Sequence, residues 1–157
     1  MQNMISFFKL IRWKNLFLIA LSQILVKYAL IEPFGVVNFT LNTFTFCLLV
    51  TATLLIAAAG YIINDIFDIE TDTINKPTKV IVGRKISEKL AFSAYVTFTS
   101  IGVILGFYVS NLINQNTLSS IFVIVSVLLY LYAVQLKRTI LVGNIIISIL
   151  VASSVLI

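Results

Sequence analysis

Residues 42–74 read NTFTFCLLVTATLLIAAAGYIINDIFDIETDTI, a long apolar segment that ends in a run of acids. Its apolar part, residues 42–67, is longer than the roughly 20 residues that a helix needs to cross a bilayer. Transmembrane β-strands would instead alternate with a period of two, and no such alternation is seen here. The chain holds 6 acids in total, and most of them follow this segment closely. The stretch therefore predicts a membrane-spanning helix with an acidic cluster at its end.

Composition extends this prediction to the whole chain. Of the 157 residues, 60% are hydrophobic and 11% are charged, and the mean hydropathy is +1.08. Soluble domains are usually about 45–50% apolar and about 25% charged. We therefore expect an integral membrane protein of the all-α class, a polytopic transmembrane helix bundle. Its apolar runs predict five spans, near residues 13–31, 42–67, 88–110, 118–135 and 140–157.

Two scarce residue types limit the chemistry. The chain has no histidine and a single cysteine, Cys47, which lies inside an apolar run. This composition excludes a disulfide framework, His-ligated metal sites and a histidine general base. A metal ion would have to be held by oxygen ligands.

The net charge of +5 is distributed in a way that predicts topology. The loops at residues 32–42 and 110–117 contain no Lys or Arg. By the positive-inside rule, the N-terminus and the acidic cluster are therefore predicted to be cytoplasmic. Lys27 does not fit, and we expect it to snorkel outward or to face a polar cavity. No basic patch with interleaved aromatic residues predicts nucleic-acid binding. The basic residues that fit the rule are Lys9, Arg12, Lys14, Lys76, Lys79, Arg84, Lys85, Lys89, Lys137 and Arg138.

The acidic cluster predicts a metal site. On a continuous helix, Asn64, Asp68 and Asp72 would share one face, because they are four residues apart. Like charges at this spacing cost about 0.2–0.5 kcal/mol per pair, and acids at a helix C-terminus also oppose the helix dipole. A compensating cation is therefore expected. Mg²⁺ prefers oxygen ligands and usually shares them with a phosphate. The predicted ligands are Asn64, Asp65, Asp68 and Asp72.

Basic and small residues surround this cluster. Lys76, Lys79 and Arg84 follow the acids, so they either neutralise a diphosphate or form a solvated loop. Lys137 begins a second polar group. The amide of Asn144 costs roughly 1–3 kcal/mol if it is buried without a partner, so it should bond a neighbouring helix or face a polar cavity. The small residues at 57–60 and the GxxxG pattern at 102–106 predict close helix packing, which at 57–60 would also narrow a cavity beside the acids.

These motifs resemble those of a known family. The pattern NDxxDxxxD at residues 64–72, followed by INKP at 74–77 and GRKIS at 83–87, is similar to the first signature of the UbiA-type intramembrane prenyltransferases. The segments IRWKNL at 11–16 and LKxxxxxxN at 136–144 fit as well. The resemblance covers essentially the whole chain. Partly through GYIIND at 60–65, it is closest to the geranylgeranylglycerol-phosphate geranylgeranyltransferase branch.

The resemblance implies an activity. It is the Mg²⁺-dependent transfer of an isoprenoid chain from an allylic prenyl diphosphate to a membrane-associated acceptor, a glycerol-phosphate lipid in this branch. An aromatic acceptor, as in quinone biosynthesis, is the alternative. In the implied mechanism the allylic C–O bond ionises, the acceptor attacks the carbocation, and an apolar cavity excludes water. The implied catalytic residues are Asn64, Asp68 and Asp72. The implied diphosphate ligands are Lys76, Lys79, Arg84, Lys137, Asn144 and Arg12.

The resemblance also implies a fold larger than this chain. The family fold is a bundle of nine transmembrane helices with two acidic motifs facing each other across a cavity. Residues 1–157 are therefore expected to be the N-terminal part of a single domain, with the C-terminal half as a partner that supplies the second motif. One departure is Lys79-Val80, where family members often have Arg-Pro, because lysine lacks the bidentate fork of arginine.

Two other classes of protein stay open at this point. A membrane cation transporter would place its acids toward the bilayer midplane, whereas here they cluster at the predicted cytoplasmic boundary. A non-catalytic membrane fragment would bind neither Mg²⁺ nor a diphosphate.

Overall fold

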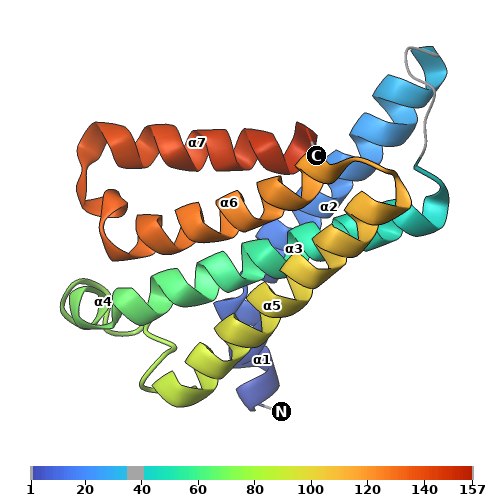
Figure 1. The fold of residues 1–157 in the computed structure, drawn as a ribbon. Coiled ribbons are helices and arrows are strands. Elements are labelled where there is room, and N and C mark those ends of the chain that lie inside the picture. Colours follow the sequence, from blue (N-terminus) through green and yellow to red (C-terminus); the bar gives the residue numbers. More distant parts are fainter. Residues whose placement is uncertain (1, 35–40, 157) are drawn as a thin grey trace.

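The computed structural model describes residues 2–34 and 41–156, which fold into a bundle of helices (Figure 1). Within this part of the chain the only strand-like feature is an isolated bridge between Val82 and Ile86. The predicted all-α class is confirmed. The elements are α1 (Gln2–Leu10), α2 (Trp13–Leu25), η1 (Val26–Ile31), η2 (Glu32–Phe34), α3 (Thr43–Phe67), α4 (Ile69–Asn75), α5 (Glu88–Leu112), α6 (Asn116–Val134), η3 (Leu136–Arg138) and α7 (Ile140–Leu156).

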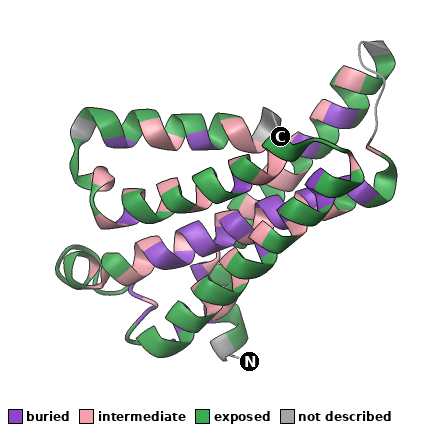
Figure 2. Cartoon of the chain, in the orientation of Figure 1, coloured by how far each residue is buried: buried purple, intermediate pink, exposed green. Residues whose placement is uncertain are grey.

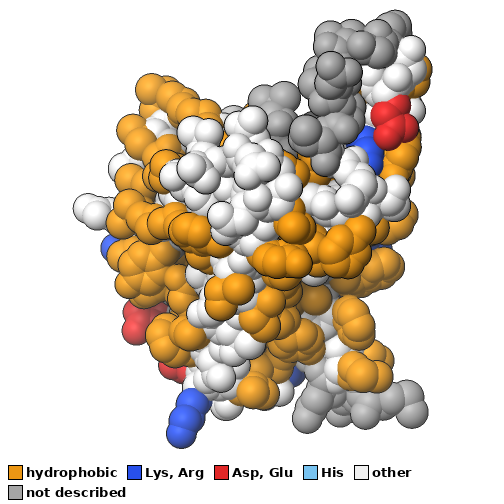
Figure 3. Space-filling model, turned by 45° about the vertical axis from the view of Figure 1, so that its right-hand side comes forward, with side chains coloured by type: hydrophobic (Ala, Val, Ile, Leu, Met, Phe, Trp, Pro, Cys, Tyr) orange, Lys and Arg blue, Asp and Glu red, His pale blue; other side chains and the backbone are white. Residues whose placement is uncertain are grey.

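Four of the five predicted spans are long and apolar enough to cross a membrane. They are Trp13–Ile31, Thr43–Phe67, Glu88–Leu112 and Asn116–Val134. The fifth predicted span forms α7, which has 17 residues and is shorter than the other four. Hydrophobic side chains are widespread on the face seen in Figure 3, as expected for helices that face lipid. The chain is an integral membrane protein that crosses the bilayer several times.

Helix α3 is the central element of the bundle. It packs against α5, α6 and α2, and Figure 2 shows that buried residues are concentrated along it. Half of its 18-residue apolar window is buried, against 11% and 17% for the other spans. The helix that leads into the acidic cluster is thus also the most buried of the four spans. One cluster of buried residues in the bundle contains Phe46, Leu49, Ala52 and Ile56 from α3, together with Val109 from α5 and Phe122 from α6.

Glycines in α5 let the neighbouring helices approach closely. A Cβ atom at Gly102 would lie 2.7 Å from Cγ1 of Ile56. A Cβ atom at Gly106 would overlap the ring of Phe122, which is only 2% exposed. The prediction that the GxxxG pattern marks helix contact is therefore confirmed. On α3, Ala58, Ala59 and Gly60 are buried too, in agreement with the predicted packing.

The loop between α4 and α5 is attached to the bundle by apolar side chains. Val82 and Ile86 are buried and pack with Leu10 and Ile62 in a second cluster. Gly83 turns the chain between them with a φ of 83°, a conformation that L side chains rarely adopt. Helix α5 begins directly after Ser87, whose Oγ accepts a hydrogen bond of 3.3 Å from the N–H of Leu90 and so caps the helix.

Lys27 neither snorkels to the surface nor lines the cavity found among the described residues. It is 4% exposed and lies in η1, a short π-helical segment. Its Nζ donates to the carbonyl of Leu41 at 3.2 Å and sits 4.5 Å from the centre of the Phe46 ring. A carboxylate oxygen of Glu32 lies 3.9 Å away. The buried charge is therefore compensated by a carbonyl, a ring face and a distant carboxylate.

Candidate active site

The acidic motif lies where α3 ends and α4 begins. Asp68 separates the two helices with φ −95° and ψ 0°, outside the normal helical region. In Figure 1, α4 is seen nearly end-on at the end of α3, so the chain turns sharply here. The expectation that Asn64, Asp68 and Asp72 share one face of a continuous helix is thus corrected beyond Asp68. A break is consistent with the repulsion expected between closely spaced acids.

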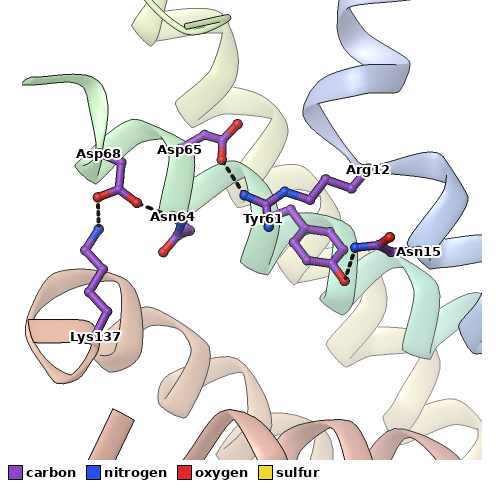
Figure 4. A network of polar contacts seen from close by, with 7 residues as sticks. All are labelled: Arg12, Asn15, Tyr61, Asn64, Asp65, Asp68 and Lys137. Carbon is purple, nitrogen blue, oxygen red and sulfur yellow. Dashed lines mark hydrogen bonds and ion pairs between the residues drawn. The ribbon is translucent and has the colours of Figure 1, made fainter. Parts of the chain in front are cut away.

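Asp68 is held from two sides (Figure 4). Lys137 Nζ donates to Oδ1 of Asp68 at 2.7 Å, and Asn64 Nδ2 donates to Oδ2 at 2.9 Å. The side chains of Lys137 and Asp68 are only 14% and 23% exposed. Lys137 comes from η3, 69 residues further along the chain. Both oxygens of this carboxylate therefore accept a hydrogen bond, one of them from a cation.

Asp65 has a basic partner of its own. Arg12 Nη2 donates to Oδ1 of Asp65 at 3.0 Å, and the guanidinium lies 4.8 Å from the centre of the Tyr61 ring. Asn15 Nδ2 donates to the hydroxyl of Tyr61 at 3.5 Å. Arg12 also has a left-handed backbone, with φ 52° and ψ 52°, at the turn between α1 and α2. This conformation costs a non-glycine residue roughly 1–2 kcal/mol, so the surrounding contacts must hold it in place.

A cavity of about 240 Å³ opens between α2, α3, α6 and α7, next to these ion pairs. Arg12, Tyr61 and Asn64 line it near the acids, while its walls are mainly apolar. The small residues Ala57 and Gly60 also line it, which agrees with the predicted cavity beside the acids. The other lining residues are Ile19, Thr53, Ile56, Phe122, Val125, Leu129, Tyr132, Ile147, Leu150, Val151 and Ser154.

The structure joins only part of the predicted site. Arg12, Asn64, Asp65, Asp68 and Lys137 form the two paired groups described above. Within the described part of the chain, the remaining predicted residues form no side-chain hydrogen bond or ion pair with these groups, although the N–H of Asp72 donates to the carbonyl of Asp68 at 2.7 Å. Their role in the site stays a prediction. Asp72 is half-buried on α4; Lys76, Lys79 and Arg84 are exposed in the loop, and Asn144 is exposed on α7.

The four predicted metal ligands can each offer a side-chain oxygen, which is the ligand atom that a hard cation prefers. Among the residues that the structure describes, however, no three Asp, Glu, His or Cys side chains gather closely enough to hold a metal ion. Asp65 faces Arg12 and Asp68 faces Lys137, so each acid already lies beside a positive charge. The set of four predicted ligands stays a prediction.

Sequence reasoning missed Tyr61 and Asn15. Tyr61 supports the guanidinium of Arg12, and Asn15 contacts the Tyr61 hydroxyl. A signal for Tyr61 was present, because it precedes Asp65 by four residues and so lies on the same face of α3. Asn15 lies in the segment IRWKNL, which carried part of the family resemblance, but only the fold places α2 beside α3 and so brings Asn15 to Tyr61.

Comparison with known proteins gives consistent matches. Digeranylgeranylglyceryl phosphate synthases from Sulfurisphaera tokodaii and Hyperthermus butylicus are 33% and 32% identical to this chain, over 95% and 99% of its length. A solved structure, from work on digeranylgeranylglyceryl phosphate synthase in membranes, superposes on 99% of this chain with a TM-score of 0.82 and 29% identity.

These matches are partial on the side of the relatives. The chain covers 50% and 49% of the two synthases and 52% of the solved structure. It thus spans about half the length of the curated relatives it matches. The family model for the UbiA prenyltransferases matches residues 17–157, a segment that contains the acidic motif, its lysine partner and nearly all residues around the cavity. The chain therefore belongs to the UbiA prenyltransferase family.

Proposed function

We propose that this chain carries the first acidic motif of a membrane prenyltransferase that transfers a geranylgeranyl chain from its diphosphate to a glycerol-phosphate lipid. One observation carries the proposal: the two ion pairs, Lys137–Asp68 and Arg12–Asp65, lie beside an apolar cavity inside the membrane bundle. A prenyl diphosphate has the same division into a charged head and an apolar chain. The names of the relatives favour a glycerol-phosphate acceptor over an aromatic one.

The basic residues are proposed to bind the diphosphate. Lys137 and Arg12 reach their acids with charge-assisted hydrogen bonds, and the same groups suit phosphate oxygens. Arg12 offers a planar fork for two oxygens, whereas Lys137 acts as a point charge. As negative charge develops on the departing diphosphate, these donors stabilise it. Lys76, Lys79, Arg84 and Asn144 are proposed as further ligands of the same group.

The acids are proposed to hold a divalent metal, specifically Mg²⁺, through Asn64, Asp65, Asp68 and Asp72. When bound, such an ion supplies Lewis-acid stabilisation of the diphosphate oxygens. The apolar cavity wall, which includes Ile56 and Leu129, is proposed to hold the prenyl chain and to exclude water from the reacting carbon. Asn64 lines this cavity and also bonds Asp68, so it links the chain-binding space to the acids.

The second acidic motif and part of the acceptor site are proposed to come from helices equivalent to the other half of the relatives. The acidic motif is proposed to face the cytoplasm, because the turns that carry Arg12 and Lys137 lie beside it. The pairing of the acids with Lys and Arg beside an apolar cavity gives no support to a cation pathway, which would need acids accessible across the membrane.

Substitution of Asp68 tests this function directly. In liposomes that hold this chain together with the helices that supply the second motif, Asp68→Ala should weaken binding of Mg²⁺ with pyrophosphate and lower geranylgeranyl transfer by roughly a hundredfold or more, as is typical when a group that stabilises transition-state charge is removed. Binding is followed by calorimetry and transfer with a radiolabelled prenyl donor.

The matched control is Glu70→Ala, which removes an exposed acid of α4 two residues away. It should leave binding and transfer close to those of the unchanged protein. Full turnover by Asp68→Ala would overturn the proposal.

A further inference from the structure

The position of Lys137 depends on a tight turn between α6 and α7. Lys137 is the middle residue of η3, and the backbone of the preceding residue, Leu136, is hydrogen-bonded to Thr139, which follows η3. The carbonyl of Leu136 accepts hydrogen bonds from the N–H of Thr139 at 3.0 Å and from the Thr139 hydroxyl at 2.6 Å. A three-residue turn held in this way leaves the backbone of Lys137 little freedom.

Gly143 closes this turn from the first part of α7. Its N–H lies 3.2 Å from both the carbonyl and the hydroxyl oxygen of Thr139. A Cβ atom at residue 143 would lie 2.6 Å from the carbonyl oxygen of Leu136 and 3.4 Å from Cα of Lys137. Both are backbone atoms, so they cannot move aside by a rotation of a side chain. Any residue larger than glycine must displace the turn that carries Lys137.

We infer that Gly143 is a positioning residue for Lys137: its missing side chain lets α7 clamp the η3 turn so that the ammonium group meets Asp68. Lysine is long and flexible, with a stem of four carbons, and ordering it costs conformational entropy. A rigid backbone anchor at Leu136 and Thr139 reduces that freedom before the 2.7 Å contact with Asp68 forms. The catalytic importance of the contact rests on the proposed function, but the positioning itself does not.

A simpler role for Gly143, packing α7 against α6, makes a different prediction. If Gly143 served only packing, its substitution would lower stability without selectively loosening the Lys137–Asp68 contact. If it positions Lys137, the contact itself must weaken. The experiment therefore needs to measure the contact directly rather than activity alone.

A carbodiimide that joins a lysine to a carboxylate without a spacer reports on this contact. We expect the unchanged protein in detergent to form an amide between Lys137 and Asp68, seen as a cross-linked peptide by mass spectrometry. In Gly143→Ala the yield should fall roughly tenfold, the change in population expected when one charge-assisted hydrogen bond is lost. An unchanged yield in this variant would overturn the inference.

Gly102→Ala is the matched control, because its new Cβ would also be crowded, 2.7 Å from Ile56, but between α3 and α5. It should leave the cross-link yield unchanged; an equal loss would show that crowding anywhere in the bundle has the same effect and would also overturn the inference. Should Gly143→Ala not fold, Thr139→Val decides the question, since it removes the hydroxyl's bonds to the Leu136 carbonyl and the Gly143 N–H without adding bulk beside the turn. Its yield should fall severalfold, and no decrease would contradict the inference.

Binding of Mg²⁺ with pyrophosphate separates this inference from the proposed function. If both hold, Gly143→Ala should weaken binding in the unchanged background and have little further effect when combined with Lys137→Met. Additive losses in the double variant would contradict positioning through Lys137. Normal cross-linking in a protein that binds no pyrophosphate would refute the proposed function and leave the positioning role intact.

Discussion

The polar residues around the end of α3 are paired across long stretches of sequence. Arg12 reaches Asp65 over 53 residues, and Lys137 reaches Asp68 over 69 residues. Within an apolar bundle an unpaired carboxylate would be costly, so each pairing stabilises an acid that its own helix does not accommodate. The two acids therefore connect the end of α3 to the turn before α2 and to η3.

A double-mutant cycle on Arg12 and Asp65 measures the strength of one of these ion pairs. Arg12 is 44% exposed and Asp65 is 22% exposed, so solvent screens part of the attraction and we expect a coupling free energy of about 0.5–1 kcal/mol. The variants are Arg12→Met, Asp65→Asn and their combination, and the free energy of unfolding in detergent is measured for each. Coupling should decrease as salt is added.

Lys14→Met provides the control for that cycle. Lys14 is exposed and its Nζ lies 6.0 Å from the ring centre of Trp13, and among the described residues it forms no ion pair with Asp65. Its substitution should be additive with Asp65→Asn. Equal coupling for Lys14 and Arg12 would mean that Asp65 responds to the general positive charge and not to the ion pair.

At the scale of the elements, helix contact depends on where a glycine meets a rigid neighbour. Gly106 faces the ring of Phe122, whereas Gly60 faces the side chain of Leu129, whose Cδ1 would lie 3.0 Å from a new Cβ atom. An aromatic ring that is 2% exposed has little room to move. Both side chains line the cavity, but a new Cβ atom would overlap the ring of Phe122, whereas it would only crowd the flexible end of Leu129. Identical substitutions at the two glycines should therefore have different costs.

We predict that Gly106→Ala lowers the free energy of unfolding by about 1–3 kcal/mol, the usual cost of overpacking a core. Gly60→Ala should cost clearly less, and both are measured by thermal unfolding in detergent. Combining Gly106→Ala with Phe122→Leu should recover part of the loss, because the smaller side chain makes room for the added methyl group. No recovery, or a larger loss at Gly60, would contradict this account of the packing between α5 and α6.

At the scale of the whole molecule, the ion pairs bring three turns to one end of the bundle. These are the turn between α1 and α2 at Arg12, the break between α3 and α4 at Asp68, and η3 at Lys137. The loop after α4 lies at this end too (Figure 1). The basic residues that the sequence assigns to one side of the membrane are therefore together in space, as the positive-inside rule requires.

Labelling of introduced cysteines tests the sidedness. In a Cys47→Ser background, Thr78→Cys is placed in the loop between α4 and α5 and Gln115→Cys in the turn between α5 and α6. A maleimide that does not cross membranes should label residue 78 only in inside-out vesicles and residue 115 only in right-side-out vesicles. The opposite pattern would place the acidic motif outside the cell.

The class of the protein could be predicted without a structure, and so could a hypothesis for its chemistry. Continuous apolar runs leave the backbone no hydrogen-bonding partner except itself, so they must form helices in a bilayer. The spacing within residues 64–72 and the absence of histidine pointed to oxygen-based diphosphate chemistry. The start of α5 at Ser87 and the contact through Gly102 and Gly106 were also predictable, because capping and close helix approach depend on residues near in sequence.

Which residues contact each other across distant segments became clear only from the packing of the helices. Spacing along one helix predicts that Asp68 and Asp72 share a face, but the helix breaks at Asp68, and the cation that contacts the Asp68 carboxylate comes from Lys137, a distant residue. The same limit explains why Tyr61 and Asn15 were missed and why Gly143 could be seen only as a small residue near Asn144. Helical periodicity reports which residues share a face, whereas contacts between distant segments depend on how those faces pack, which no local pattern encodes.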